Sequence, residues 1–441
     1  MTIIPYACMM NDPTTEVVVV WLDRRENPVA ASQTLRYGPD NLEVHSNFVE
    51  VRGGFSENDI PVTCIRHYVH LTNLAPGSLC ALSLPVEGIT FPPVKMLPVR
   101  IPQAGITGMA ISDTHVGKRT IDEPSKFDHI AAESPDFIIM PGDAVGEGDT
   151  LLRVANGEIW ADAFTHYFSR WWDHRNFLPQ ILYCPGNHDV RNGNADGETL
   201  GSAILGTGMV DWMLPSMKLS QPAGERHVFV RAGNWLYVFG ADVYSAIVAD
   251  AKDRFEKYYD PEPGFGIFMA HSPMFSEGSR NSNDPIIQAN MRNAFLRNLS
   301  ERENMRMAVA GNIHLDYITK PLAWYPDNPG QPAVALDEGF AAPAPDGPFT
   351  ITEFGEGCLG GRRLLSEPVV PKAIWDRTET RGLNYYLLHF TPGHVLVEDK
   401  NESGTAESRE FRFPFLERNN GILARCYRSG GSPVYPHRLR D

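Results

Sequence analysis

The pattern of hydrophobic positions changes once along the chain, near residue 101. Before that point, short β-branched or alternating runs are separated by turn residues, and no helical period interrupts them, which is typical of an all-β region. The predicted strands cover residues 16–23, 34–37, 42–51, 62–71 and 79–85. We therefore expect residues 1–101 to form an all-β domain.

A proline-rich connector follows, from Phe91 to Pro102, and should be extended and stiff because each proline fixes its own φ. After it, apolar strands alternate with helical stretches, the pattern of a layered α/β domain. Strands are predicted over residues 106–111, 137–140, 181–184, 235–240, 265–270 and 307–310, and helices over 125–133, 159–175 and 290–301. A hairpin over 384–388 and 395–397 closes this domain, which we place at residues 102–400.

The last segment, residues 401–441, is a C-terminal extension whose structure the sequence does not predict. From Arg418 onward it carries five arginines against one acidic residue, Asp441. Two interpretations stay open for it: a solvated tail, or an arm that packs on a second copy of the chain. A homo-oligomer formed through the N-terminal domain is open as well.

Composition limits the function classes. The 441 residues are 42% hydrophobic and 21% charged, which is ordinary for a soluble globular protein with more than one domain. The formal net charge of −15 repels polyanions. This charge disfavours a nucleic-acid partner and favours a small-molecule substrate.

The cysteines and the N-terminus bear on the expected location. The six cysteines lie far apart and form no Cys-x-x-Cys pair, so they are expected to be reduced thiols. The N-terminus has no signal-peptide pattern, and no apolar stretch reaches the length of a membrane span. We expect a cytoplasmic protein with no membrane partner. A protein packed into a virus particle after synthesis would have the same features, so a virion location stays open.

Five short polar phrases each follow an apolar strand. They are Gly108–His115, Pro141–Asp143, Pro185–Asp189, Met269–Pro273 and Ala310–His314. In an α/β sheet, the loops beyond the carboxyl ends of the strands converge on one rim. Side chains that are far apart in sequence can therefore meet there.

These phrases supply carboxylates, imidazoles and amides but no cysteine, which favours Mn²⁺, Fe or Zn²⁺ at a hydrolytic site over a closed structural zinc site. Asp113 and His115 are two residues apart, so both side chains lie on one side of an extended segment and can reach one ion. Asp143 has two carboxylate oxygens and can bridge two ions about 3.5 to 4 Å apart. The pattern thus predicts a site for two metal ions.

The series Asp-x-His, Gly-Asp, Gly-Asn-His-Asp, His and Gly-x-x-His resembles the calcineurin-like metallophosphoesterase superfamily over about residues 105–320. The turn phrase Leu74–Gly77 resembles that of a fibronectin type III sandwich. With the phrases Ser134–Phe137 and His314–Tyr317, this N-terminal domain makes the chain most similar to the purple acid phosphatase branch. The resemblance implies an α/β fold, a four-layer β-sandwich flanked by helices, behind an all-β sandwich.

The resemblance also implies a ligand set and a reaction. The first metal would be bound by Asp113, His115, Asp143 and His314, and the second by Asp143, Asn187, His271 and Asn312. His188 would face the substrate and assist the leaving group, with Asp189 orienting it. The implied reaction is hydrolysis of a phosphate mono- or diester by attack of a metal-bound hydroxide.

Asn312 departs from the family pattern, in which a histidine stands at this position. An amide oxygen is a weaker ligand than an imidazole for late transition metals, so the second site is expected to be weaker. One alternative is therefore a catalytically weakened structural or binding protein, such as a virion component, that keeps the fold. A second alternative is a metal-dependent nuclease, which the net charge disfavours.

Overall fold

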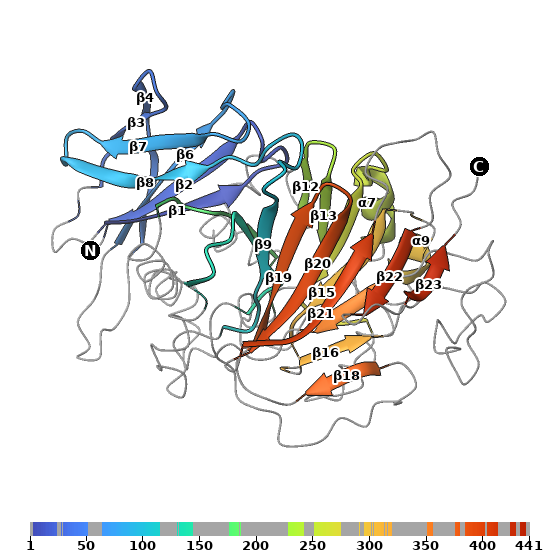
Figure 1. The fold of residues 1–441 in the computed structure, drawn as a ribbon. Helices are drawn as coiled ribbons and strands as arrows, with labels where there is room; N and C mark the ends of the chain where they lie inside the picture. Colours follow the sequence, from blue (N-terminus) through green and yellow to red (C-terminus); the bar gives the residue numbers. More distant parts are fainter. Residues whose placement is uncertain are drawn as a thin grey trace, which may run out of the picture.

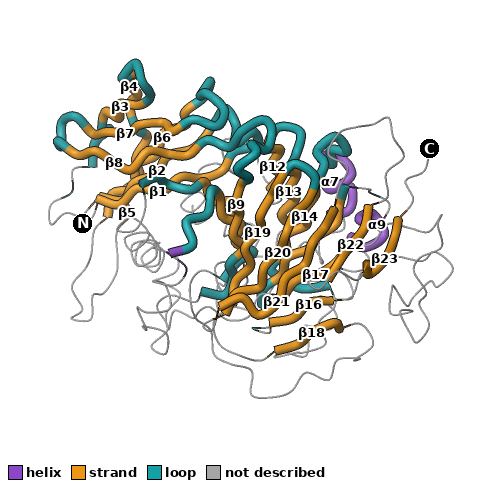
Figure 2. Tube along the Cα trace, viewed as in Figure 1, coloured by secondary structure: helices purple, strands orange, loops and turns teal. Residues whose placement is uncertain are grey.

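In the computed structural model of the chain, the described residues are 3–23, 28, 30–51, 64–114, 130, 132–143, 176–184, 186, 228–241, 251–274, 291, 295–300, 302, 304–312, 314, 316–319, 351–355, 375–379, 384–401, 404–412, 424–428 and 433–437. Three sheets contain the strands of this part of the chain (Figure 1). Strands predominate over helices among the described elements (Figure 2).

The largest sheet has 12 strands in the order β23-β22-β21-β20-β19-β9-β10-β11-β1-β2-β6-β5. In chain order, these strands are β1 (Ile3–Met9), β2 (Val17–Asp23), β5 (Asn47–Val51), β6 (Cys64–Leu71), β9 (Ile106–Ala110), β10 (Phe137–Met140), β11 (Gln180–Tyr183), β19 (Asn384–Thr391), β20 (His394–Asn401), β21 (Gly404–Arg412), β22 (Ala424–Arg428) and β23 (Pro433–His437). Its centre, β9-β10-β11, is parallel. The predicted hairpin is confirmed as β19 and β20, and β19 pairs antiparallel with β9.

The second sheet has seven strands in the order β12-β13-β14-β15-β17-β16-β18. They are β12 (Val228–Ala232), β13 (Leu236–Ala241), β14 (Phe265–Ala270), β15 (Met305–Ala310), β16 (Asp316–Thr319), β17 (Thr352–Gly355) and β18 (Trp375–Glu379). Strands β13, β14, β15 and β17 run parallel to one another. Strands β13, β14 and β15 are buried along their whole length, as expected for parallel strands covered on both faces.

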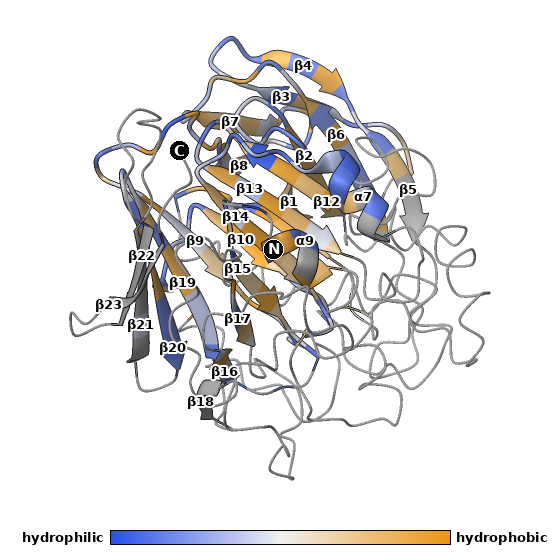
Figure 3. Ribbon diagram, turned by 90° about the vertical axis from the view of Figure 1, so that its right-hand side faces the viewer, coloured by the Kyte–Doolittle hydropathy of each residue, from blue (hydrophilic) through white to orange (hydrophobic). Residues whose placement is uncertain are grey.

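The two large sheets pack face to face. One core cluster contains buried side chains from both, among them Ile138 of β10 and Ile267 of β14. On its other face, the seven-stranded sheet packs against the helices α7 (Ala251–Tyr258) and α9 (Arg297–Ser300), through Phe255 and Leu299. The central strands of this stack are hydrophobic over most of their length (Figure 3). The expected layered α/β arrangement is therefore present.

The N-terminal strands are joined to the large sheet. Strand β1 pairs in parallel with β11, and β2, β6 and β5 continue the sheet beyond it. A third sheet has the order β4-β3-β7-β8, with β3 (Thr34–Tyr37), β4 (Leu42–His45), β7 (Leu79–Leu84) and β8 (Ile89–Lys95). A separate apolar cluster lies between these strands and includes Val19, Leu82 and Phe91. The fibronectin type III likeness and the domain boundary near residue 101 stay predictions.

Some elements differ from the expectation. The proline-rich stretch contains an edge strand, β8, which tolerates Pro92 and Pro93 because β8 pairs with β7 alone in its sheet. Strand β1 was not predicted, and the C-terminal extension contributes β21, β22 and β23. The predicted helix over 159–175 lies outside the described residues, as does most of the one over 125–133.

Among the described residues, Cys8, Cys80 and Cys184 are buried thiols, as the sequence predicts. Burial raises the pKa of the Cys8 thiol to about 12, so this thiol stays protonated at neutral pH. In the described part of the chain, no helix combines the length and the apolar character needed to cross a bilayer.

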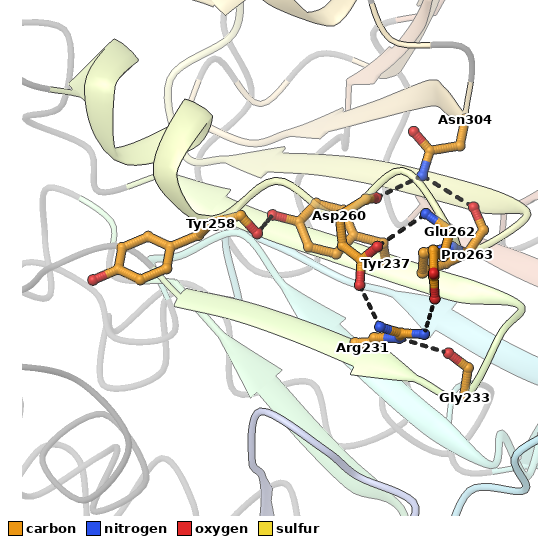
Figure 4. A network of polar contacts seen from close by, with 8 residues as sticks. All are labelled: Arg231, Gly233, Tyr237, Tyr258, Asp260, Glu262, Pro263 and Asn304. Carbon is orange, nitrogen blue, oxygen red and sulfur yellow. Dashed lines mark hydrogen bonds and ion pairs between the residues drawn. The ribbon is translucent and has the colours of Figure 1, made fainter.

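A polar network holds the loop that leads into β14 (Figure 4). Arg231 of β12 forms ion pairs with Asp260, at 2.6 Å, and with Glu262, at 2.8 Å. The side-chain amide of Asn304 donates hydrogen bonds to the carbonyls of Asp260 and Pro263, both at 3.0 Å. Because β14 and β15 begin here, this network lies at the opposite end of these strands from the polar loops that follow them.

Candidate metal centre

The loops that follow β9, β10, β14 and β15 meet at one rim, as the sequence predicts. Within the large sheet, Asp113 N–H donates to the carbonyl of Gly142 at 3.1 Å. Within the second sheet, Gly311 N–H donates to the carbonyl of His271 at 3.0 Å. The backbone N–H of Asn312 then donates to Asp113 Oδ2 at 2.8 Å and joins the two pairs of loops.

Three predicted ligands form a compact buried cluster. Asp113, Asp143 and His271 each offer one ligand atom, and these atoms all lie within 4.8 Å of one another. The exposed fractions of the three residues are 0%, 1% and 0%. Two carboxylates buried this close together repel each other strongly in a low-dielectric interior, and a cation between them offsets that repulsion.

The hydrogen bond of His271 fixes which ring nitrogen can bind a metal. Its Nδ1 lies 2.8 Å from the carbonyl oxygen of Pro141, and a carbonyl only accepts, so Nδ1 carries the proton. Nε2 faces Asp143 Oδ2 at 3.3 Å. When the His271 ring is neutral, Nε2 and Asp143 Oδ2 are both acceptors that face each other. A metal ion between them would bind a lone pair of each. In a metal-binding histidine, the ring nitrogen that does not bind the metal usually donates a hydrogen bond to an acceptor such as a backbone carbonyl.

His314 joins the cluster through Asp113. Its Nε2 lies 3.0 Å from Asp113 Oδ1, and both side chains are buried. The structure therefore places four of the predicted ligands together: Asp113, Asp143, His271 and His314. Asn312 is present at the same rim through its backbone N–H. This donor set of carboxylate and imidazole groups fits one or more transition-metal ions.

The backbone of the centre is left-handed at four positions. Asp113, Asp143, Asn312 and His314 have positive φ angles of 50°, 50°, 71° and 55°, respectively. Asp, Asn and His are the non-glycine residues that adopt this conformation most often, and such positions cluster at functional sites. Four of them at one rim indicate that the surrounding structure holds these side chains in a required geometry.

Two glycines let the loops approach each other closely. Gly142 has a φ of 98°, and a Cβ on it would lie 2.5 Å from Gly186 N and 2.8 Å from His271 Nδ1. A Cβ on Gly186 would in turn collide with Asp143. Side chains at either position would therefore push a ligand out of place.

We expect Gly142→Ala to lower Mn²⁺ affinity by about tenfold or more, as loss of a supporting contact typically does. Gly38→Ala is the matched control, because Gly38 also has a positive φ, of 70°, but a Cβ there meets nothing within 4 Å. Both variants should lose about 1–2 kcal/mol of stability, because alanine is strained at a positive φ. Isothermal titration calorimetry with Mn²⁺ checks the prediction, which equal affinities in the two variants would contradict.

The other predicted site residues, His115, Asn187, His188 and Asp189, lie outside the described residues, so their roles stay predictions. The structure adds groups that the sequence analysis passed over. The Ser112 hydroxyl donates to the carbonyl of Gly142 at 3.1 Å, and the Pro141 carbonyl orients His271. Ser112 and Pro141 lie within the polar phrases that follow the strands, and this position was the sequence signal that could have identified them.

Comparisons with known proteins agree with this geometry. The family model described as calcineurin-like phosphoesterase matches residues 108–316, the segment that contains the four clustered residues predicted as ligands. The search of curated proteins finds no match.

Two solved structures share the fold. One is a purple acid phosphatase from yellow lupin (Lupinus luteus) seeds, with 12% sequence identity and a TM-score of 0.62, over 92% of this chain and 73% of that one. The other is PhoD, with 11% identity and a TM-score of 0.60, over 100% of this chain and 91% of that one. The matched segment, residues 108–316, is thus similar to the calcineurin-like phosphoesterase family, and the two solved structures share the fold of the chain.

Proposed function

We propose that the protein is a metal-dependent hydrolase of phosphate esters that acts on a mono- or diester. The observation that carries this proposal is the buried cluster of Asp113, Asp143 and His271 at the rim where the two large sheets meet. The match to the calcineurin-like phosphoesterase family supports the reaction class.

The ligand roles follow the positions of the family motif. Asp113, His115, Asp143 and His314 would hold the first ion, and Asp143, Asn187, His271 and Asn312 the second. When bound, the ions supply the positive charge that binds phosphate oxygens and the nucleophile for hydrolysis. His188 protonates the leaving oxygen, and Asp189 orients His188.

The chain's own residues set the order in which the ions bind. The first site has two carboxylates and two imidazoles in its proposed ligand set. The second has an amide oxygen from Asn312 where the family has an imidazole, so it is the weaker site. Mn²⁺, which accepts oxygen ligands readily, fits this second site better than Zn²⁺, and Fe is the third candidate.

The substrate, partners and location complete the proposal. The net charge of −15 favours a small phosphate ester over a nucleic acid. We propose a cytoplasmic protein, with a virion location as the alternative, and a homo-oligomer formed through the N-terminal strands or the C-terminal extension as a further option.

The test is a Mn²⁺ titration of metal-stripped protein with two chromogenic substrates, p-nitrophenyl phosphate and bis(p-nitrophenyl) phosphate. His188→Ala is the paired variant, and we expect its rate to fall by about 10²–10⁴-fold, the usual contribution of a general acid. The substrate that is turned over faster identifies a monoesterase or a diesterase.

Absence of turnover with both substrates at saturating Mn²⁺ would contradict the proposal and favour a binding protein with a weakened centre. Cleavage of single-stranded DNA under the same conditions would favour the nuclease instead. Equal rates for the wild-type protein and His188→Ala would overturn the role of His188 while leaving the reaction class intact.

A further inference from the structure

Glu353 occupies an unusual position for a carboxylate. It lies on β17, next to β15 in the second sheet, and pairs with Ala308. Only 1% of the residue is exposed. Burial of a charged side chain is costly unless its oxygens receive hydrogen bonds, so the partners of Glu353 indicate what it does.

The two oxygens of Glu353 bind two different segments of the metal centre. Oε2 accepts the backbone N–H of Met274 at 2.8 Å, and Oε1 accepts the hydroxyl of Tyr317 at 2.7 Å. Met274 follows His271 by three residues, and Tyr317 follows His314 by three residues. One buried carboxylate thus holds segments that carry two of the four clustered ligands.

The direction of these hydrogen bonds is fixed by chemistry. A backbone N–H can only donate. Burial, and then the charge of Glu353, raise the pKa of the Tyr317 phenol well above its ordinary value, so this hydroxyl keeps its proton and donates it. Glu353 also anchors its own strand, because its backbone N–H donates to Thr319 Oγ1 at 2.9 Å.

The loop from His271 to Met274 is therefore held at both ends. At its start, His271 donates to the Pro141 carbonyl. At its end, it crosses from β14 past β15 to reach Glu353 on β17. Loss of the hydrogen bond to Met274 would remove one of the contacts that position the His271 backbone, which Gly311 N–H also holds, without removing any ligand.

We infer that Glu353 is a positioning residue that sets metal affinity by holding the His271 loop and the segment after His314 in register. The inference rests on the proposed function, since it assigns Glu353 to the same centre. It concerns metal binding alone and does not depend on which ester is hydrolysed.

Three variants test the inference by isothermal titration calorimetry with Mn²⁺ on metal-stripped protein. Glu353→Leu removes both hydrogen bonds, and we expect Mn²⁺ affinity to fall by about 10- to 100-fold, as for other groups that orient metal ligands. Glu353→Gln keeps both, because its carbonyl can accept from Met274 while its amide donates to the Tyr317 oxygen, and should bind within about threefold of wild type. Tyr317→Phe removes one hydrogen bond and should give an intermediate loss.

Asn304→Leu is the matched structural control. Asn304 is buried and also makes hydrogen bonds through its side chain, but at the opposite end of β15 (Figure 4). Asn304→Leu should lower the unfolding temperature of the metal-free protein, as is also expected of Glu353→Leu, and should leave Mn²⁺ affinity unchanged. Titrations well below the lowest unfolding temperature separate affinity from stability.

Wild-type affinity in Glu353→Leu, or an equal loss in Asn304→Leu, would overturn the inference and leave Glu353 a structural residue. A different outcome separates the two proposals. If the wild-type protein binds Mn²⁺ and Glu353→Leu binds it much more weakly, but the wild-type protein hydrolyses no ester, the inference holds and the proposed function is overturned. A wild-type protein that binds no Mn²⁺ would overturn both.

Discussion

Replacement of Asp143 by asparagine will lower Mn²⁺-dependent ester hydrolysis on the order of a thousandfold, the loss that follows removal of a charge-stabilising group from an active site. Asp143 lies in the buried cluster with Asp113 and His271. An amide in its place carries no negative charge and offers one oxygen where the carboxylate offers two, so it cannot bridge two ions in the same way.

The same substitution should not destabilise the metal-free protein. Asp113 and Asp143 are both buried, and neutralising one of them removes their mutual repulsion. We therefore expect Asp143→Asn to unfold at the same temperature as metal-free wild type or higher. Mn²⁺ should raise the unfolding temperature of the wild type by selective binding to the folded state, and should leave that of Asp143→Asn unchanged.

Thermal unfolding with and without Mn²⁺, together with the hydrolysis rate, checks both parts. Asp260→Asn is the control, since it weakens the ion pair with Arg231 at the far end of the sheet. It should lower stability slightly and keep the full response to Mn²⁺. An equal Mn²⁺-dependent rise in the unfolding temperatures of Asp143→Asn and the wild type would exclude Asp143 from the metal centre.

Removal of residues 1–101 will prevent the remainder of the chain from folding into a soluble protein. Strand β1 lies in the interior of the large sheet, between β11 and β2, and pairs Ala7 with Gln180 and Cys8 with Ile181. Without it, β11 becomes an unprotected edge, which is a template for aggregation. The main core cluster would also lose eight buried side chains, those of Tyr6, Cys8, Met9, Met10, Val18, Val20, Leu22 and Leu97.

Polar contacts strengthen the connection between the N-terminal segment and β11. The buried Gln180 side chain donates to the carbonyls of Pro13, at 2.9 Å, and Lys95, at 3.1 Å. Lys95 of β8 also forms an ion pair with Asp136, just before β10. Truncation would leave the amide of Gln180 without these acceptors, at a cost of about 1–3 kcal/mol for a buried polar group.

Soluble yield and circular dichroism of residues 102–441 measure the outcome, and co-expression of residues 1–101 as a separate chain is the control. We expect the co-expressed pieces to restore solubility by rebuilding the β1–β11 pairing. A soluble, folded fragment of residues 102–441 that binds Mn²⁺ would show that the N-terminal strands are dispensable for the core.

The sequence predicted the strands that carry the centre because β9, β10, β14 and β15 are mostly apolar, and a polar residue follows each of them within three positions. It could not predict that β1 joins β11, since a pairing between segments about 170 residues apart leaves no local periodic signal. Glu353 was missed for a related reason. It stands alone between Thr352 and Phe354, and its importance comes from partners that only the folded sheet brings near.

The left-handed backbone at the rim bears on which residues these positions can accept. At φ 71°, asparagine is among the non-glycine residues that adopt this conformation most readily, because its short amide bonds locally to the backbone. The histidine that the resemblance places at position 312 would be a better metal ligand, and His314, with a φ of 55°, shows that histidine also adopts this conformation at the rim. Under the proposed ligand set, the backbone at position 312 therefore accepts either residue, and the choice between them bears on the affinity of the second site alone.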